Sequence, residues 1–412
     1  MNSTDNLGST AAGISTDQGV LPDSSSSSAV SVRIARSIEE VEAIREIWIA
    51  WKGHRDSDID FCLEYVWSGE AFIRPHVIVI HRHGRPDAML VGRLERARMN
   101  SKVGFLRFPG MRARLLTFAY RGLLGNPSAE NSEEFIKSIM KALRQGEANV
   151  AMLHQPSTDS PLYQKALSVP GFASRDHLTN PAPHYLMQLP DNIDEVYRGL
   201  SSSLRAELRR KQRKILGDFA GVKILCFRDS AELDGVLPRV EEIAKKTYQR
   251  GLGVGFQDTE QMRRRLKLCA RKGWLRVYLL SFGDRPCAFC IGTVYDGIFL
   301  GDYVGYETEF RKYSPGSLLL IAMIEEFCKE GVKAYDFGFG DADYKELFGN
   351  HLRLESSVYI FAPSVKGLSL NTVRTTTGLI DNTVKKALER MNLLPKIKKL
   401  WRGRLAKQTS TE

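Results

Sequence analysis

The sequence predicts an α/β protein (α+β) made of two similar halves, each with a mixed, mostly antiparallel sheet flanked by helices. Strand and helix patterns follow one another in nearly the same order along both halves, which indicates an internal duplication. The turns His83-Gly84-Arg85-Pro86 and Gly283-Asp284-Arg285-Pro286 fall at equivalent places and join strands as hairpins. Later in each half a helix separates two strands, which allows a parallel crossover between them.

The second half has the clearer pattern. Apolar residues at helical spacing, Leu233, Val236 and Val240, mark one helix, and Asp296-Gly297 is a strong hairpin signal between two strands. The strands expected there are Val222–Phe227, Leu275–Phe282, Cys287–Tyr295, Ile298–Gly305, Val332–Phe337 and Ser356–Phe361. The expected helices are Ala231–Arg250, Thr259–Lys272, Gly316–Lys329 and Ala342–Phe348.

The first half repeats this order with little residue identity. Its expected strands are Val32–Ala35, His76–His81, Ala88–Leu94, Val103–Phe108, Val150–His154 and His184–Gln188. Its expected helices are Ile38–Trp51, Asp58–Trp67, Ser132–Leu143 and Pro161–Leu167. Between the halves, residues 197–214 are densely basic and include serines that favour a helix start. We expect there either a cationic rim beside an acidic ligand or a solvated helix face.

Composition divides the chain further. Residues 1–30 are rich in Ser, Thr, Gly and Asp, which is typical of a disordered leader. We expect a first domain over 31–192, a second over 193–365 and a basic amphipathic tail over 366–412. Within the tail, residues 385–407 hold nine basic side chains interleaved with Leu, Ile and Trp. This pattern indicates a helix on a membrane surface, or a helix docked on the protein with a solvated basic face.

The charge balance indicates an anionic partner. With 59 Lys and Arg against 48 Asp and Glu, the net charge of +11 suits a nucleotide-bearing cofactor, a nucleic acid or a lipid surface. The start of the sequence does not resemble a secretory signal, and no apolar run reaches the length of a spanning helix. The six cysteines lie mostly within apolar segments, as buried, reduced thiols of a cytoplasmic protein would.

A loop ahead of an apolar helix, residues 310–317, is the most specific local signal. Ser314 suits the N-cap and Pro315 suits the first helical position. The amides of Gly316–Leu318 are then free to face an anion such as pyrophosphate. An ordinary capped helix is the simpler interpretation. The residues that would bind the anion are Arg311, Lys312, Tyr313, Ser314, Gly316 and Ser317.

The element order, the loop Tyr313–Gly316 (YSPG) and the segment Asp336–Lys345 (DFGFGDADYK) together resemble the GNAT acyltransferase superfamily. More narrowly, they resemble the CelD-like acetyltransferases of cellulose-biosynthesis clusters, which are related to the Fem peptidyltransferases with their tandem GNAT-like halves. These motifs cover about residues 204–361, and the first half is similar by pattern only. The resemblance implies an acyl-CoA donor at the strand-loop-helix junction, with an acetyl or longer acyl group passing to an amine or hydroxyl and no metal.

The sequence departs from the usual GNAT phosphate loop, Q/R-x-x-G-x-G/A, because only Gly316 is present. Fewer glycines let fewer backbone amides approach a pyrophosphate closely. Two alternatives therefore stay open: an aminoacyl-tRNA-dependent transferase like the Fem proteins, and a non-catalytic module of a polysaccharide-assembly complex. The resemblance also places the protein in envelope or exopolysaccharide biosynthesis, in the cytoplasm or at the inner face of the membrane.

Direct acyl transfer needs a group that takes the acceptor's proton and a donor that stabilises the tetrahedral oxyanion. Asp336 ends a strand beside a crossover loop, so it is the first candidate for the base or for positioning the acceptor. Lys345 would steady a phosphate or the oxyanion. Tyr303 and Tyr306 are candidates for the general acid, and their odd separation places one of them in the crevice. The simpler interpretations are a helix cap, a solvated lysine and ordinary strand packing.

Overall fold

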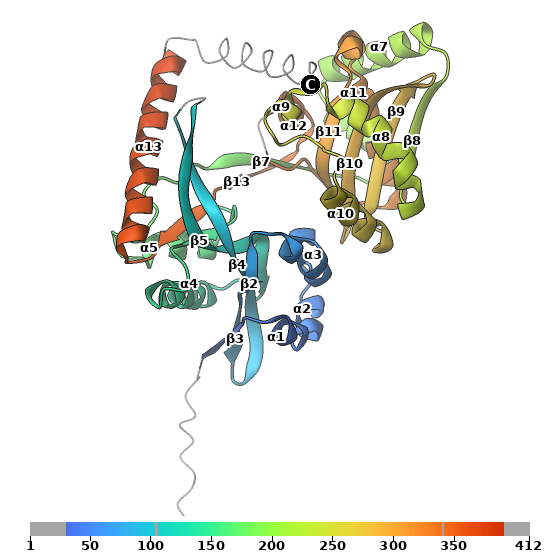
Figure 1. Ribbon diagram of the computed structural model, residues 1–412. Coiled ribbons are helices and arrows are strands. Elements are labelled where there is room, and N and C mark those ends of the chain that lie inside the picture. The colour runs from blue at the N-terminus through green and yellow to red at the C-terminus, as the bar shows by residue number, and fades with distance from the viewer. Residues whose placement is uncertain (1–29, 104–105, 340–341, 391–412) are drawn as a thin grey trace, which may run out of the picture.

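A computed structural model describes residues 30–103, 106–339 and 342–390 (Figure 1). In order along the first part of the chain lie the strands β1 (Ser31–Ala35), β2 (Phe72–Pro75), β3 (Val77–Arg82), β4 (Arg85–Val103), β5 (Leu106–Gly125), β6 (Val150–Leu153) and β7 (Ala182–Gln188). The helices of this part are α1 (Ile38–Glu42), α2 (Arg45–Ala50), α3 (Ile59–Glu64), α4 (Ala129–Arg144), α5 (Pro161–Ser168) and α6 (Ile193–Gly199).

The second part of the chain continues with the strands β8 (Val222–Phe227), β9 (Leu275–Phe282), β10 (Arg285–Tyr295), β11 (Ile298–Tyr306), β12 (Ala334–Asp336), β13 (His351–Glu355) and β14 (Val358–Phe361). Its helices are α7 (Ser202–Asp218), α8 (Leu233–Ala244), α9 (Tyr248–Gly251), α10 (Glu260–Arg271), α11 (Pro315–Glu330), α12 (Asp343–Phe348) and α13 (Val365–Arg390). Short 3-10 turns include η1 (Arg55–Ser57) and η4 (Thr308–Tyr313).

The strands form two seven-stranded sheets, and helices flank both of them (Figure 1). The first sheet has the order β1-β3-β4-β5-β6-β14, with β2 paired to β4, and the second has the order β13-β7-β12-β11-β10-β9-β8. The neighbouring strands are antiparallel except for two parallel pairs, β5 with β6 and β11 with β12. The predicted fold class, mixed and mostly antiparallel sheets with flanking helices, is therefore confirmed.

The two sheets exchange strands. β7, expected to close the first half, lies in the second sheet between β12 and β13, with Leu186 opposite Asp336. β14, expected to close the second half, pairs with β6 of the first sheet, with Val358 opposite Leu153. The predicted boundaries at residues 192 and 365 therefore do not coincide with the two sheets, because each sheet contains a strand from the other predicted domain.

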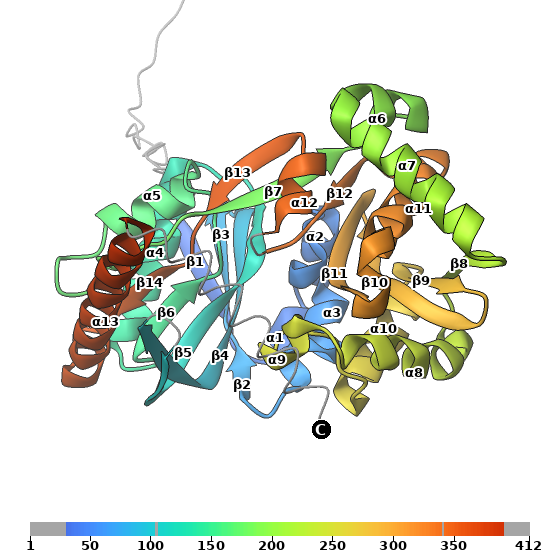
Figure 2. The same cartoon turned by 90° about the horizontal axis from the view of Figure 1, so that it is seen from above.

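Alternation along the central strands explains why each sheet is covered on both faces. In β9, Tyr278 and Leu280 pack with α7 and α11, while Val277 and Leu279 pack with α8 and α10. In β3, Ile78 packs with α4, while its neighbours pack toward α1–α3. Successive side chains of a strand point to opposite faces, so an unbroken apolar run needs helices on both sides. Figure 2 shows these layers from above.

The long β4–β5 hairpin corrects one predicted element. Val103–Phe108 is not a separate strand: β4 continues to Val103, and β5 begins at Leu106. Pro109 lies within β5 at the end of the hairpin where β5 pairs with β4 alone, and an edge of this kind tolerates a residue without an N–H. A register shift between Met99 and Ser101 accommodates the irregular backbone.

Helix α13 replaces part of the predicted tail. It runs to Arg390, and residues 391–412 lie outside the described part of the chain, so the expected basic segment 385–407 is described only at its beginning. Arg374 anchors the helix through an ion pair with Asp176 at 3.1 Å. Among the described residues, no helix is both long and apolar enough to cross a membrane.

We expect the halves not to fold separately, because each borrows a strand. A fragment of residues 193–365 lacks β7, so β12 and β13 lose the partner between them, and a fragment of residues 31–192 lacks β14. Thermal unfolding followed by circular dichroism should show one cooperative transition for residues 31–390 and none for either fragment. A fragment of residues 182–355, which keeps every strand of the second sheet, is the matched control. Cooperative unfolding of residues 193–365 alone would contradict the exchange.

Candidate active site

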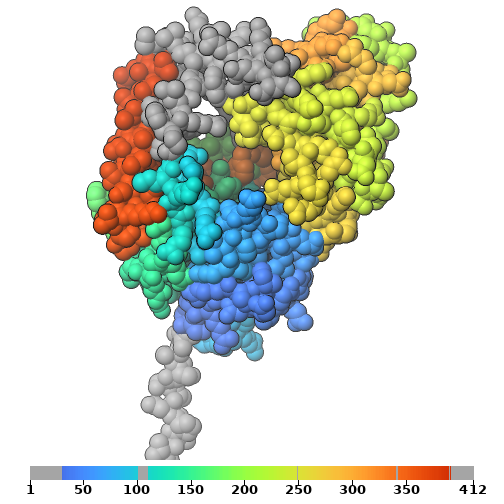
Figure 3. All heavy atoms as spheres, in the orientation of Figure 1, coloured from blue at the N-terminus to red at the C-terminus, as the bar shows by residue number. Residues whose placement is uncertain are grey.

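A cavity of about 630 Å³ opens between the two halves of the molecule. The first half lines it with the turn η1 and β5, and the rest of the lining comes from β7, β11, β12, α12 and the loops beside them. Figure 3 shows the surface hollowed between the β4–β5 hairpin and the second half. Elements that are distant in the sequence therefore meet in one site.

The cavity lies where two parallel strands part. β11 and β12 pair only from Ile298–Leu300 to Ala334–Asp336. Beyond this point, residues 301–304 of β11 and residues 337–339 after β12 line the cavity, while β11 continues to pair with β10 on its other edge. Among the described residues, the cavity-side edge of β11 beyond Leu300 has no strand partner, so it presents backbone amides and carbonyls. Such an edge suits an extended ligand that carries amide groups.

His184 on β7 lies between two carboxylates. Its Nε2 donates to Asp336 Oδ1 at 2.6 Å, and its Nδ1 lies 2.9 Å from Glu355 Oε2 on β13. All three side chains are buried, with 2–5% exposed. Burial alone would lower the pKa of His184, but the hydrogen bonds and charges of Asp336 and Glu355 raise it to about 9. The ring is therefore an imidazolium at neutral pH.

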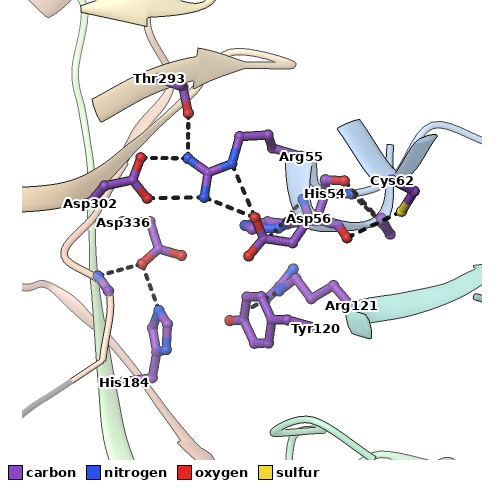
Figure 4. Close-up of polar contacts among 12 residues, drawn as sticks. His54, Arg55, Asp56, Cys62, Tyr120, Arg121, His184, Thr293, Asp302 and Asp336 are labelled. Carbon is purple, nitrogen blue, oxygen red and sulfur yellow. Dashed lines mark hydrogen bonds and ion pairs between the residues drawn. The ribbon is translucent and has the colours of Figure 1, made fainter. Parts of the chain in front are cut away.

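Asp336 ends β12 with its carboxylate fixed at one oxygen. Oδ1 accepts from His184 and from the Gly338 amide at 2.8 Å. Burial would raise the pKa of Asp336, but the His184 hydrogen bond and charge lower it below its ordinary value. The second oxygen points away from both donors, toward the space between Asp336 and Asp56 (Figure 4). Asp336 therefore presents an ionised oxygen to the cavity.

Arg55 in the turn η1 joins the two halves. It donates to both oxygens of Asp302 on β11, at 2.7 and 3.0 Å, and to Thr293 Oγ1 at 2.8 Å (Figure 4). Arg265 of α10 contacts the same Asp302 carboxylate at 2.7 Å. Both guanidinium groups are nearly fully buried, with 4% and 7% exposed. Two buried cations thus share the Asp302 carboxylate, which makes this cluster a polar link between the halves.

Asp56 and His54 form the wall of the cavity that faces Asp336. Asp56 Oδ1 accepts from Arg55 at 2.8 Å, and its other oxygen lies on the side of Asp336 and His184 in Figure 4. Burial would raise the pKa of Asp56, but Arg55 holds it well below its usual range. Burial lowers the pKa of His54 to about 4, and its Nδ1 accepts from the Asp56 amide, so the neutral ring carries its proton on Nε2.

An aromatic cluster separates the two walls. The Tyr120 ring of β5 lies edge-on to His54 at 4.9 Å and to Phe339 at 5.0 Å, and it stacks on His184 at 6.1 Å. The Tyr120 hydroxyl donates to Glu355 at 3.1 Å. These contacts fix the orientation of the His184 ring and exclude water from one side of the ion pair. An aromatic ring face also attracts a cationic ligand.

The structure brings together three of the four residues predicted for catalysis. Asp336, Tyr303 and Lys345 line the cavity, whereas Tyr306 lies outside it and is 39% exposed. As expected from their odd separation on one strand, one of the two tyrosines, Tyr303, lies in the cavity and the other lies outside it. Lys345 is buried, and its Nζ donates to the carbonyls of Gly338 and Phe339 at 3.0 and 2.7 Å. Lys345 therefore fixes the loop after Asp336.

The predicted anion loop differs from its expected geometry. Ser314 takes a left-handed conformation with φ of 53°, and its side chain does not cap the helix. Its carbonyl accepts from the amides of Ser317 and Leu318 at 3.0 and 3.4 Å, so the expectation that all three amides from Gly316 onward are free is wrong. A Cβ built on Gly316 would meet only Tyr306, at 3.9 Å, so this glycine is open to the outside.

The remaining loop residues surround this opening with positive charge. Tyr313 is buried and donates to Asp218 at 2.8 Å, with Lys312 and Lys214 over its ring. Arg311 and Lys312 are exposed. A shallow depression beside the loop is lined by Lys211, Ser314 and Ser317. The loop residues thus lie at the N-terminal end of α11, and they do not line the cavity that holds Asp336.

Sequence reasoning missed most of the first-half wall and the partners of Asp336. His54, Arg55, Asp56 and Tyr120 have no motif, and His184 was predicted only as the start of a strand. They come from the turn at η1, from β5 and from β7, so no local spacing connects them with Asp336. The one usable signal was a cluster of three polar residues, 54–56, between two expected helices.

Comparison with known protein families finds one match. Residues 202–346 match the acetyltransferase (GNAT) domain. This GNAT segment holds Tyr303, Asp336, Lys345 and the loop Arg311–Ser317, and it excludes the first-half wall together with His184 and Glu355. No curated protein matches the sequence.

Solved structures are similar to this chain at low sequence identity. FemX is 12% identical over 73% of this chain and 90% of its own, with a TM-score of 0.51. A tandem GNAT protein from the clavulanic acid biosynthesis pathway is 11% identical over 82% of this chain and 99% of its own, with a TM-score of 0.46. A GCN5-related N-acetyltransferase from Anabaena variabilis is 14% identical, covering 82% and 74% of the two chains, with a TM-score of 0.37.

Replacing His184 with Gln tests the buried imidazolium. The pKa of His184 is about 9 in the folded protein and 6.5 in its ordinary state. Protonated His184 therefore adds to the free energy of unfolding in full below pH 6.5, and this contribution is lost as the pH rises to 9. We expect the free energy of unfolding of the wild type to fall by up to about 3 kcal/mol over that window, and His184→Gln to lose this dependence. Urea unfolding across the window measures it. The control is His351→Gln, exposed on β13, and an NMR pKa of His184 below 6.5 would contradict the assignment.

Asp302→Asn tests the link between the halves. The change leaves Arg55 and Arg265 buried without their shared carboxylate, so we expect a loss of about 3–5 kcal/mol in the free energy of unfolding. Asp284→Asn, in the turn between β9 and β10, is the matched control. A loss below about 1 kcal/mol, measured by chemical denaturation, would show that solvent reaches the cluster.

Proposed function

We propose that the protein transfers an acyl group from acyl-CoA to an amine bound in the cavity between the halves. The observation that carries the proposal is the ionised, half-free carboxylate of Asp336 at the point where β11 and β12 part. The GNAT match over residues 202–346 supports acyl transfer, and it includes this strand junction. The choice of an amine rests on the charges around the cavity.

Cations near the cavity already have acceptors. Arg55 and Arg265 are paired with Asp302, His184 with Asp336 and Glu355, and Lys345 with two carbonyls. Among the described carboxylates that line the cavity, the second oxygens of Asp56 and Asp336 still face it with accepting capacity (Figure 4). A donor-rich, cationic group complements two ionised carboxylates beside aromatic rings. A protonated amine meets this requirement better than a hydroxyl, a carboxylate or a phosphate.

The donor fits the edge of β11. A pantetheine arm carries amides that pair with the backbone of residues 301–304, which puts the thioester at the strand junction beside Asp336. The phosphates of CoA would then lie toward Gly316 and the exposed basic residues of the loop and α7. Arg311, Lys312, Lys211 and Lys214 supply charge there, while Ser314 and Ser317 supply hydroxyls.

The bound ammonium first releases one proton to solvent, because only the neutral amine has a lone pair for attack. The neutral amine then attacks the thioester carbonyl, a C–N bond forms, and the nitrogen becomes positively charged and acidic. From this point one more proton must leave the nitrogen and one must reach the sulfur. Asp336 accepts that proton through its second oxygen, because even a carboxylate of low pKa is basic enough for this nitrogen. The C–S bond then breaks, and the thiolate takes a proton from the acid. Tyr303, in the cavity with its pKa raised by burial, is the candidate acid.

Two finer assignments belong to this proposal. The resemblance to CelD-like proteins favours an acceptor from envelope or exopolysaccharide biosynthesis, for which an amino sugar is the natural amine. The tail supports contact with the inner face of a membrane through its basic residues. An aminoacyl-tRNA donor is the second candidate, because α7 exposes Arg209, Arg210 and Arg213 beside the loop. Salt-sensitive tRNA binding with no acyl-CoA binding would favour it.

The test combines donor binding with turnover. Calorimetry with acetyl-CoA and longer acyl-CoAs should show binding that Gly316→Trp weakens, since its side chain enters the opening beside Tyr306. Thiol release with glucosamine, compared with glucose as the matched alcohol, should favour the amine. Asp336→Asn should lower kcat by about 10²–10⁴-fold without changing donor affinity.

Asp343→Asn, exposed on α12, is the matched control for Asp336→Asn and should keep full activity. If no acyl-CoA binds, the assignment of acyl-CoA as the donor is wrong. Turnover of the alcohol but not the amine sinks the acceptor assignment while leaving acyl transfer intact.

A further inference from the structure

The β4–β5 hairpin carries an exposed cluster of arginines that the cavity does not use. Arg96 lies directly opposite Arg114, and Arg98 lies opposite Arg112. Opposite partners share one face of a two-stranded ribbon, and residues two apart on a strand share it as well. The four side chains, all exposed, therefore form a two-by-two array on one face. We name Arg96, Arg98, Arg112 and Arg114 the arginine ladder.

The ladder lacks counter-charges within the described part of the chain. Arg114 donates to the Gly146 carbonyl at the end of α4, at 2.6 Å, and no described carboxylate pairs with any of the four. The nearby Glu95 is occupied by Arg93 and Thr117. Like charges directly opposite each other destabilise strand pairing. Two such pairs in register therefore lower the stability of the hairpin, and no described carboxylate compensates for them.

The opposite face of the same ribbon is packed. Ala97, Met99, Ala113 and Leu115 contact the small core that includes Leu370 of α13. Figures 1 and 2 show α13 lying along one side of the hairpin. The hairpin is thus held from behind and presents its arginines outward. A solubilising role does not require this arrangement, because single charges already protect a strand edge.

We propose that the arginine ladder binds the phosphate groups of an anionic lipid surface. A guanidinium group binds phosphate through two parallel hydrogen bonds, and four on one face engage several headgroups together. Anionic lipid supplies the counter-charges that the register of β4 and β5 leaves missing. Each basic residue near such a surface adds attraction that salt screens. The proposal is independent of the reaction in the cavity.

Two observations favour lipid over nucleic acid. None of the exposed side chains described for β4 and β5 is aromatic, so the surface around the ladder offers no platform for base stacking there. The sequence after α13, residues 391–407, combines Lys and Arg with Leu, Ile and Trp, a composition that suits the same kind of surface. Stable attachment to a membrane generally needs two such contacts, because one alone gives weak, reversible binding.

Co-sedimentation of the full chain with vesicles tests the proposal. We expect binding to vesicles of phosphatidylcholine with about one-third phosphatidylglycerol, little binding to phosphatidylcholine alone, and release by salt. Changing all four ladder arginines to Gln should weaken binding to the anionic vesicles by at least about tenfold. The charge-matched control removes four exposed basic residues elsewhere: Arg33, Lys223, Lys245 and Lys267.

Each outcome decides the question. Equal binding by the ladder variant and the charge-matched control shows that only net charge matters and overturns the proposal. If the fourfold ladder variant loses binding to a duplex RNA but still binds anionic vesicles, the ladder is a nucleic-acid site, and the lipid proposal is overturned. If the fourfold variant does not fold, Arg98→Gln with Arg112→Gln removes one pair and should give an intermediate loss. The effect should persist in a chain that ends at Arg390, since the tail is a separate contact.

Discussion

The buried ion pair of His184 with Asp336 and Glu355 is the interaction on which the site depends. Its members come from β7, β12 and β13, which are neighbours only because β7 crosses into the second sheet. A buried charge is tolerated when its partners satisfy it closely, and here two carboxylates surround one imidazolium. The arrangement leaves one carboxylate oxygen of Asp336 for the cavity and keeps it ionised at neutral pH. The ion pair with His184 therefore determines both the position of the Asp336 carboxylate and its charge.

The Arg55 cluster complements this pair on the other side of the cavity. Asp302 lies on β11, beside the point where β11 leaves β12, so the first half contacts the second at the edge that forms the cavity. The first half therefore does more than fill space: through Asp56 and Tyr120 it supplies the wall opposite Asp336. A protein with only the GNAT segment would hold Asp336 at an open surface, where water weakens every charge–charge interaction.

Local patterns predicted the parts of the fold and site that depend on local physics. Alternation along β11 predicted that one of Tyr303 and Tyr306 lies in the crevice, and the structure places Tyr303 there. The strand end at Asp336 predicted a carboxylate that lines the cavity. The sequence could not show that His184 contacts Asp336, because 152 residues separate them and the contact requires strand exchange. The geometry of Ser314 was missed for a different reason. A serine before a proline favours a helix cap, but the preceding 3-10 turn at residues 308–313 imposes a left-handed backbone.

The exchanged strands also determine when the protein can acquire its structure during synthesis. The first sheet begins at residue 31 and receives its last strand at residue 361, so most of the chain must be made before that sheet is complete. Contacts at such sequence separation give a high contact order and slow folding. Until β14 arrives, the edge of β6 stays unpaired, and nascent chains with open strand edges associate readily with one another. We therefore expect folding in the cell to depend on chaperones that shield β6 until translation has passed residue 361.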